Sequence, residues 1–325
     1  MSRILMCGFE AGSLAVLSAY GVASISTTQA RTGSYSFYVG TGTSYGILSL
    51  ATSVSELYLR VGIWPAATSN DNDLVALRNI STSTMLLVGR RGSGVLYYTI
   101  PGKITINGTR SVPSNQWFCL QVYLNIASSG GRLIAYVDET QDVDYTGDTQ
   151  ATTPANVAHL RLGYGVAAAY FDDIAVNDTT GPTNNSWPGR GGIYAVRPSD
   201  AGAYTEWSVS GASANWDAVD EAPPSTTDYV YTAEAGKIDT YQASDLSTAG
   251  SISAVRYYAY AQLNEAGEAG IKPIYYIGGT AYEGTAVALD TSWRYASEIV
   301  QVNPATGNAW TVSEINAMQL GVKSW

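Results

Sequence analysis

The sequence of 325 residues has little charge and few reactive side chains. It contains two cysteines, one histidine and four lysines, and charged residues make up 14% of the chain, with a net charge of −10. Phosphate binding needs clustered lysine and arginine, so no nucleic-acid partner is expected. Hydrolytic sites built around histidine are excluded unless His159 serves alone.

The cysteines and the apolar segments argue against further classes of protein, namely metal-binding, membrane and exported proteins. Cys7 and Cys119 lie far apart and in no metal-binding pattern, so we interpret them as small buried apolar residues. No segment approaches the roughly eighteen apolar residues that span a bilayer, so no membrane partner is expected. Residues 1–21 are interrupted by Glu10 and predict a first strand, not a signal peptide. We therefore expect synthesis in a cytoplasm without an export signal.

Short runs of alternating apolar and polar residues dominate the chain. They are rich in Tyr, Val, Ile and Leu and are separated by polar or glycine-containing turns, which predicts β-strands. These runs are 34–40, 56–64, 117–126, 132–139 and 170–178, then 226–233, 252–264, 272–279, 286–290, 295–303 and 319–325. One short helix is predicted over 311–318, with Thr311 or Ser313 as its N-cap. The predicted fold class is all-β.

One segment divides the chain. Residues 177–192, NDTTGPTNNSWPGRGG, combine Gly, Pro, Asn and Thr without periodicity. Such a segment is typical of a domain boundary. We predict a β-sandwich over 1–180, a linker over 181–192 and a second β-sandwich over 193–325.

Four motifs in the first half resemble the concanavalin-A-like, laminin-G-like jelly rolls. An aromatic-led strand passes through a glycine turn to a strand ending in YVD, and a glycine-bearing strand precedes a closing FDD strand. A Phe-Glu pair and a Thr-Gly-Ser turn match the opening of that fold. The motifs are 111–145, 160–178, 8–13 and 30–39. The resemblance implies a jelly roll over most of residues 1–180.

Two segments of the second half, 215–232 and 303–325, resemble a region found in many structural proteins of tailed bacteriophages. A proline-rich turn, a Trp-Thr helix start and a closing GVK strand occur there in order. The resemblance implies a virion component, located on the virion surface and partnered by other capsid or tail subunits.

Asp172 and Asp173 are adjacent within an apolar run. Neighbouring residues of a regular strand point to opposite faces, so the two should not act as a facing pair. The jelly-roll resemblance implies a structural Ca²⁺ held by Glu10 and by Asp172 or Asp173, with backbone carbonyls completing its shell. Alternatively, the aspartates hydrogen-bond backbone amides or a neighbouring loop. No other cofactor is expected.

The sequence offers no convincing catalytic carboxylate pair. Residues 137–144, VDETQDVD, place Asp138, Asp142 and Asp144 at one parity, but Thr140 and Gln141 are typical of a hairpin tip. We interpret this segment as a solvated turn and residues 68–75 as a loop. We therefore expect that the protein is not an enzyme.

The main functional hypothesis is a structural component of a phage virion, with capsid decoration or a head fibre preferred. The alternative is a carbohydrate-binding adhesin or tail-fibre module that recognises host glycans. The 24 tyrosines suit either role. Candidate sugar-stacking residues are Trp64, Tyr97, Tyr98 and Tyr164. Trp187 and Trp325 are candidate interface anchors in a homo-oligomer or symmetric array.

Overall fold

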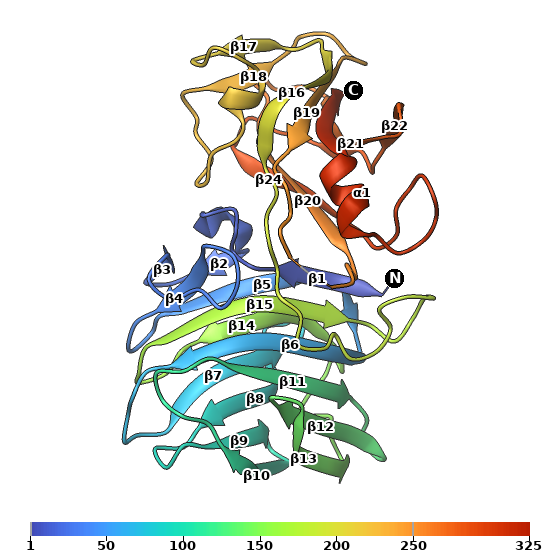
Figure 1. Ribbon diagram of the computed structural model, residues 1–325. Coiled ribbons are helices and arrows are strands. Elements are labelled where there is room, and N and C mark those ends of the chain that lie inside the picture. The colour runs from blue at the N-terminus through green and yellow to red at the C-terminus, as the bar shows by residue number, and fades with distance from the viewer. Residues whose placement is uncertain (1, 249) are drawn as a thin grey trace. The chain divides into compact units, whose positions relative to one another are not determined.

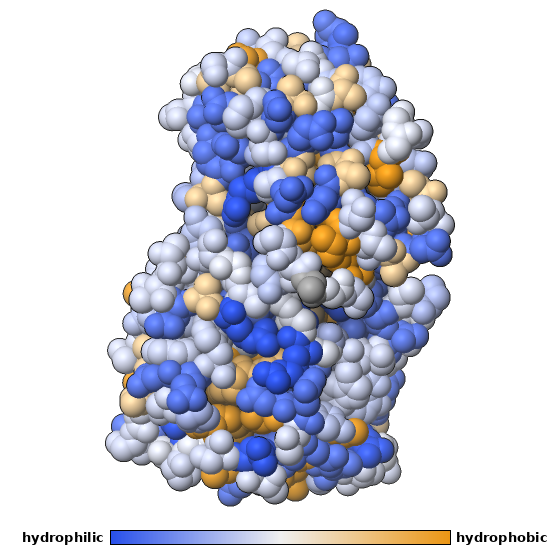
Figure 2. Space-filling model, in the orientation of Figure 1, coloured by the Kyte–Doolittle hydropathy of each residue, from blue (hydrophilic) through white to orange (hydrophobic). Residues whose placement is uncertain are grey.

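The computed structural model describes residues 2–248 and 250–325, which divide into two compact units (Figure 1). The first unit extends to Ile193 except for Ala11–Ala15, and that short segment belongs with Tyr194–Trp325 to the second unit. Both units are built almost entirely from curled β-sheets, which confirms the all-β prediction. The face displayed in Figure 2 is mainly hydrophilic or neutral, with smaller apolar areas.

The first unit contains two antiparallel sheets. Sheet I has the strand order β13 (Thr140–Gly147), β12 (Gly131–Val137), β11 (Phe118–Asn125), β6 (Glu56–Pro65), β15 (Ala169–Asn177), β4 (Ser36–Val39) and β3 (Ala23–Ser26), and β1 (Arg3–Cys7) also pairs with β15. Sheet II has the order β10 (Ile104–Ser111), β9 (Val95–Ile100), β8 (Thr84–Arg90), β7 (Asn72–Arg78), β14 (Val157–Gly163), β5 (Tyr45–Val54) and β2 (Ala19–Tyr20).

Alternation along the strands explains why the two sheets pack into a sandwich. In β6, Leu57, Leu59, Val61 and Ile63 are fully buried, and in β14 the same is true of Leu160 and Leu162. Successive side chains of a strand point to opposite faces, so these residues form the core and those between them form the two outer faces. Three phenylalanines, Phe9, Phe37 and Phe171, lie in ring contact within this core.

The segment predicted as a linker lies along the outer face of sheet I. The Trp187 ring packs edge-on against Tyr58 and Tyr136, with centroids 5.0 Å away in each case. The Gly189 amide donates a hydrogen bond to Gln121, and the Ile193 amide donates one to Asp173. The boundary predicted at 181–192 therefore lies at Ile193–Tyr194 in the structure, because side chains of sheet I hold the intervening residues.

The second unit has one six-stranded sheet and two strand pairs. Its large sheet has the order β16 (Pro198–Thr205), β19 (Ile238–Ala243), β25 (Gln319–Ser324), β21 (Gly270–Ile277) and β22 (Thr280–Glu283), with β23 (Val287–Ala288) paired to β21. The two pairs are β17 (Ser208–Ser210) with β18 (Tyr229–Tyr231) and β20 (Val255–Ala261) with β24 (Arg294–Val300). Two apolar clusters form its core, one around Ile271 and Val322 and one around Trp310.

The predicted helix is present as α1 (Val312–Ala317). Thr311 is its N-cap: the hydroxyl accepts a hydrogen bond from the Glu314 amide, and the Glu314 carboxylate accepts one from the Thr311 amide. This reciprocal pair is a capping box, and it decides the N-cap in favour of Thr311 over Ser313. The remaining helices are the one-turn 3₁₀ segments Leu14–Val16 and Trp216–Ala218 among the described residues. Over those residues, no helix has the length and apolar character that crossing a membrane requires.

Candidate functional site

The outer face of sheet II brings together a histidine, two arginines, an aspartate and several tyrosines. Strand β14 has the sequence VAHLRLG, and its leucines are buried in the core. His159 and Arg161 therefore project from the opposite face. The backbone register then determines which residues of β5, β7, β8 and β9 stand beside them.

The residues on this face form three rows across the strands, and the first row crosses β5, β14 and β7. His159 lies opposite Ser49 of β5 on one side and opposite Arg78 of β7 on the other. Ser49 Oγ and His159 Nδ1 are 3.1 Å apart, within hydrogen-bonding distance. Burial and the positive charge of Arg78 lower the pKa of His159, so the imidazole is neutral at pH 7.

The second row is centred on Arg161, whose backbone partners are Ala76 and Ile47. Its guanidinium lies 4.9 Å from the centre of the Tyr164 ring, a cation–π arrangement. Tyr164 contacts Tyr45 edge-to-face, with centroids 6.2 Å apart, and 45% of Tyr164 is exposed. Tyr164 has a φ of 93°, an unusual backbone angle for a bulky residue. Strained backbone of this kind is concentrated at binding and catalytic sites.

The third row contains Asp73, Gly89 and Tyr97, which lie opposite one another on β7, β8 and β9. The Tyr97 hydroxyl donates a 2.6 Å hydrogen bond to Asp73 Oδ1. A Cβ atom at position 89 would lie 2.2 Å from Tyr97 Cζ, so only glycine leaves room for the ring to cross β8. Burial, together with the hydrogen bond to Asp73, raises the pKa of Tyr97.

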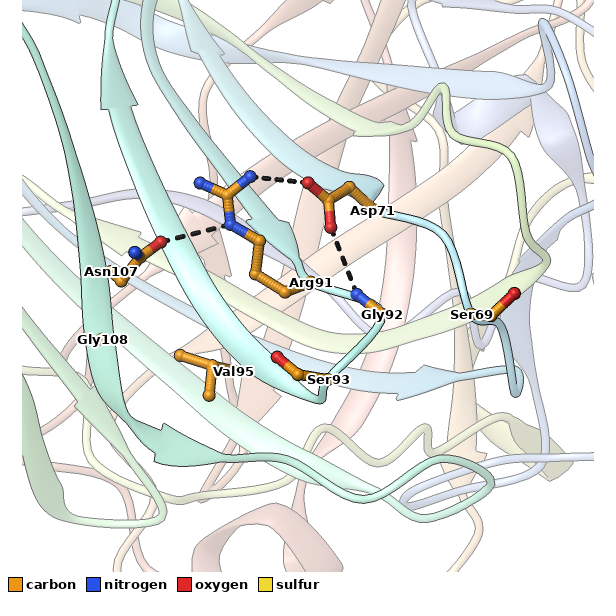
Figure 3. A pocket seen from close by; sticks show the side chains of 8 residues that line it. All are labelled: Ser69, Asp71, Arg91, Gly92, Ser93, Val95, Asn107 and Gly108. Atoms are coloured by element: carbon orange, nitrogen blue, oxygen red, sulfur yellow. Dashed lines mark hydrogen bonds and ion pairs between the residues drawn. The ribbon is translucent and has the colours of Figure 1, made fainter.

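A shallow cavity of about 570 Å³ adjoins the third row (Figure 3). Its central side chain is Arg91, which donates 2.6 Å and 3.2 Å hydrogen bonds to Asp71 and Asn107. The same guanidinium lies 4.2 Å from the centre of the Tyr97 ring. The cavity is lined by Ser69, Asp71, Arg91, Gly92, Ser93, Val95, Asn107 and Gly108. We refer to these three rows and the cavity together as the sheet II face.

Of the four predicted sugar-stacking residues, two lie on the sheet II face. Tyr97 and Tyr164 belong to the third and second rows described above. Tyr98 is fully buried on the inward side of β9, where its hydroxyl donates a 2.7 Å hydrogen bond to Asp142. Trp64 lies on sheet I and contacts Tyr170 edge-on. The structure thus separates the four, because adjacent residues of a strand point to opposite sides.

The two predicted interface tryptophans have different surroundings. Trp187 contacts Tyr58, Tyr123 and Tyr136 within the first unit. Trp325 is 40% exposed, and its backbone exchanges two hydrogen bonds with Gly270. Trp187 therefore serves intramolecular packing, whereas part of the Trp325 ring faces solvent.

Strand β15 is irregular at the two adjacent aspartates. Its pairing with β6 shifts register between Asp172 and Ala175, and Asp173 has a φ of 54°. Because of this bulge, the expected placement on opposite faces is not observed, and both carboxylates contact residues 31–32.

The hydrogen bonds of the aspartates match the alternative in which they bind backbone amides and a neighbouring loop. Asp172 Oδ2 accepts from the backbone amides of Arg31 and Thr32, at 2.8 Å and 3.3 Å. Asp173 forms a 2.6 Å ion pair with Arg31. Burial, and then the charge of Asp173, raise the pKa of Asp172 to about 8.

Glu10, the third residue predicted to bind calcium, accepts hydrogen bonds from the amides of Ser34 and Tyr35. Within residues 2–248 and 250–325, no group of three His, Cys, Asp or Glu side chains is placed to hold a metal ion. The carboxylates therefore join the segment 31–35 to the last strand of sheet I.

The acidic segment 137–144 forms a hairpin, with its tip at Asp138 and Glu139, both at positive φ. Asp142 is buried and accepts hydrogen bonds from Tyr98 and from the amides of Thr109 and Arg110. The predicted tip at Thr140 is two residues late. Asp142 is therefore not solvated, and its hydrogen bonds link β13 to β10.

Sequence reasoning missed several residues of the sheet II face. His159 was considered as the sole histidine of a hydrolytic site, and the predicted loop 68–75 includes the start of β7 and hence Asp73. Arg78 and Arg161 were not considered. The alternation of His159 and Arg161 with two leucines was a usable signal, because it puts both polar residues on one face.

No protein-family model and no curated protein matches this sequence. Several solved structures are similar at low identity, and they are carbohydrate-active β-sandwich folds. An endo-β-1,4-glucuronan lyase of the fungus Trichoderma reesei is 10% identical, with a TM-score of 0.41 over 50% of this chain and 91% of that chain. A carbohydrate esterase of the Shiga toxin-encoding bacteriophage phi24B is 15% identical, with a TM-score of 0.41 over 54% and 97%. The carbohydrate-binding module CBM66 of Bacillus subtilis is 9% identical, with a TM-score of 0.34 over 49% and 94%.

These likenesses correct one expectation. The similar structures include lyases, sialidases and an esterase, which are enzymes, and this contradicts the expectation that the protein is not an enzyme. Identities of 15% or less and TM-scores below 0.5 assign no particular ligand or reaction to this chain.

Proposed function

We propose that the protein is a surface component of a tailed-bacteriophage virion whose first unit binds a glycan on the sheet II face. The observation that carries the glycan proposal is the arrangement of Tyr164, Arg161 and Tyr45, in which a half-exposed ring stands beside hydrogen-bond donors. Sugar rings have apolar faces and hydroxyl edges, so they are bound by flat amphipathic rings combined with polar groups.

Two further features support glycan binding. Tyr164 is held over Arg161, so this half-exposed ring is positioned before a ligand arrives. Tyr97 is held by Asp73 and Arg91 but is itself buried, so it supports the face without offering its ring to a sugar. Preorganised side chains reduce the entropy lost on binding. The cavity around Arg91 adds amide and hydroxyl groups at one end of the face.

The virion part of the proposal rests on the resemblance of residues 215–232 and 303–325 to structural proteins of tailed phages. The partners would be other virion subunits, and closed symmetry would make the protein a homo-oligomer or part of an array. Capsid decoration and a tail-fibre position both fit this proposal. Electron microscopy of particles carrying a labelled copy would place the protein on the shell or on the tail, and its absence from purified particles would refute the virion assignment.

Glycan binding is tested with purified full-length protein on an array of neutral and acidic glycans. Any bound glycan is then titrated by calorimetry against Tyr164→Ala and, as a control, Trp64→Ala on sheet I. We expect Tyr164→Ala to weaken binding about tenfold or more, since full burial of a large apolar side chain contributes about 1.5–3 kcal/mol. Equal binding by wild type and Tyr164→Ala would refute the assignment to this face.

The same experiment separates binding from turnover. Mass spectrometry of the glycan after incubation shows whether it is recovered intact, shortened or deacylated. Recovery of an altered glycan with wild type but not with Tyr164→Ala would show that the sheet II face is also a reaction site.

A further inference from the structure

The sheet II face contains two arginines that form no hydrogen bond or ion pair within the described part of the chain, although Arg161 lies against the Tyr164 ring. Arg78 and Arg161 have no hydrogen-bond or ion-pair partner among residues 2–248 and 250–325, and the Nε atom of each is buried and unsatisfied. The other buried or half-buried arginines of the first unit all donate hydrogen bonds; these are Arg3, Arg31, Arg60, Arg90 and Arg91.

An unpaired, partly buried guanidinium is costly. Buried polar groups in proteins are nearly always hydrogen-bonded, and an arginine that loses water without gaining an acceptor destabilises the fold. Arg90 and Arg256 also have one buried nitrogen each without an acceptor, but both donate other hydrogen bonds, whereas Arg78 and Arg161 donate none within the described residues. Their unused donors are available to a ligand that brings its own acceptors.

Arg78 and Arg161 lie close together on the outer face of sheet II. His159 lies directly opposite Arg78, and Arg161 is two residues further along β14, so the two arginines are diagonal neighbours across one strand pair. Burial lowers the pKa of both His159 and Arg161, and the nearby positive charge of Arg78 lowers the pKa of each further. The two guanidiniums repel each other, and an anion between them would relieve that repulsion.

The surrounding acids do not neutralise this pair. Asp73 lies on β7 near Arg161, and its negative charge attracts the guanidinium. However, Asp73 Oδ1 accepts its hydrogen bond from the Tyr97 hydroxyl, not from Arg161. Asp71 is bound to Arg91 and to the Gly92 amide. The protein has a net charge of −10, so a locally cationic pair is a specific feature of this face and not a general property of the surface.

We infer that the glycan bound by the sheet II face is anionic, and that Arg78 and Arg161 bind its acidic group. This inference rests on the proposed glycan-binding function and specifies the class of ligand. Arginine presents planar, paired donors that match carboxylate and sulfate oxygens, so uronic or sialic acids and sulfated sugars share the required chemistry. His159 Nε2 and the Tyr164 ring stand beside this pair, ready to contact the sugar that carries the charge.

The test begins with a glycan array that includes neutral, carboxylated and sulfated glycans. Binding confined to acidic glycans supports the inference. Binding of neutral glycans with equal strength overturns it but leaves the proposed function standing, whereas no binding to any class overturns both. A single-stranded DNA of matched charge that competes equally well would also overturn it, because it would show charge attraction without sugar recognition.

Defined probes then locate the contact. We would titrate tetragalacturonate, its methyl ester and a heparin-derived tetrasaccharide against wild type, Arg78→Gln, Arg161→Gln and Arg132→Gln. Arg132 is the matched control because it is an arginine of the same unit, on sheet I, paired with Asp144 at the surface. Glutamine keeps most of the side-chain length and removes the charge.

The expected result is binding of an acidic probe that falls about tenfold or more in Arg78→Gln and Arg161→Gln and is unchanged in Arg132→Gln. If the arginines bind a carboxylate, tetragalacturonate should bind and its methyl ester should not. If they bind a sulfate, the heparin-derived tetrasaccharide should bind more tightly than tetragalacturonate. Thermal unfolding verifies that each variant is folded. Arg78→Gln should be as stable as wild type or more so, since it removes a guanidinium that has no hydrogen-bond acceptor. Arg161→Gln should differ little from wild type, since it also removes the cation–π contact with Tyr164. Acidic-probe binding that survives both substitutions would refute the assignment.

Discussion

The Tyr97 hydroxyl reaches Asp73 Oδ1, 2.6 Å away, by crossing over the backbone of Gly89. The three residues lie on neighbouring strands, and the absence of a side chain on the central one lets the outer two meet. Arg91 packs against the same ring. One hydrogen bond thus positions an aromatic side chain of the candidate site.

Gly89→Ala should disturb this relationship. The added methyl group would overlap the Tyr97 ring, whose Cζ lies 2.2 Å from the Cβ position, so the ring must move away from Asp73. We expect a loss of about 1–3 kcal/mol in the free energy of unfolding, measured with denaturant. Gly40→Ala is the control, because its new Cβ would meet only Ser44 Oγ at 3.6 Å. Equal stability of the two variants would contradict the steric argument.

Arg31→Ala should destabilise the first unit strongly. The Asp173 side chain is fully buried, and its 2.6 Å ion pair with Arg31 compensates the charge. Removing one partner of a buried pair leaves an uncompensated charge and costs about 3–5 kcal/mol.

The control for Arg31→Ala is Arg132→Ala, which breaks the exposed ion pair between Arg132 and Asp144. That change should cost less than about 1 kcal/mol, because water screens surface pairs. Urea unfolding of both variants provides the measurement. A similar cost for the two would show that Asp173 does not depend on Arg31.

Asp172 should make stability depend on pH. Its folded-state pKa of about 8 lies above the ordinary value of 3.8, because burial and Asp173 disfavour the charged form. Between these values the folded protein holds a proton that the unfolded chain has released. The stability contributed by the protonated group is therefore complete below about pH 4 and is lost as the pH rises towards 8.

Asp172→Asn should remove this part of the pH dependence. For one group the slope is at most about 1.4 kcal/mol per pH unit, and the variant should show a flatter slope between pH 5 and pH 7.5. Its absolute stability should fall, since the single oxygen of Asn can accept from the amides of Arg31 and Thr32 but leaves the Asp173 amide without the acceptor that Oδ1 provides. The exposed Glu265→Gln serves as control and should retain the wild-type slope. An unchanged slope in Asp172→Asn would show that the carboxylate titrates normally.

Thr311→Ala should weaken the short helix α1. The substitution removes the hydroxyl that accepts a hydrogen bond from the Glu314 amide, and loss of such a cap costs about 0.5–2 kcal/mol. Ser313→Ala removes a hydroxyl two residues later, inside the helix, and should cost less than about 0.5 kcal/mol. Thermal unfolding of the two variants compares the positions directly. A larger effect at Ser313 would contradict the capping role of Thr311.

Local patterns in the sequence predicted part of the secondary structure, but not strands such as β5, β10 and β14. The alternation around Leu57 to Ile63 predicted β6, and the spacing of Thr311 and Glu314 is sufficient to specify a helix start. These features depend on residues within a few positions of one another. The sequence also implied an all-β fold, which the structure confirms.

Features that join distant segments were not predictable in this way. Residues 181–192 were predicted to be a linker because they lack periodicity, and the sequence did not show that Trp187 and Gly189 have partners on sheet I more than fifty residues away. Asp172 and Asp173 were expected on opposite faces, and a bulge in β15 turns both toward residues 31–32. Neither outcome can be derived from local composition.

The sequence alone determined which side chains alternate and so which residues could face outward, including His159 and Arg161. Only the tertiary structure decided that Arg78 lies opposite His159, that Asp73 meets Tyr97, and that Tyr98 is in the core. The reason is that a strand's alternation is a local property of its backbone, whereas its neighbours and their register are selected by packing of the whole sandwich.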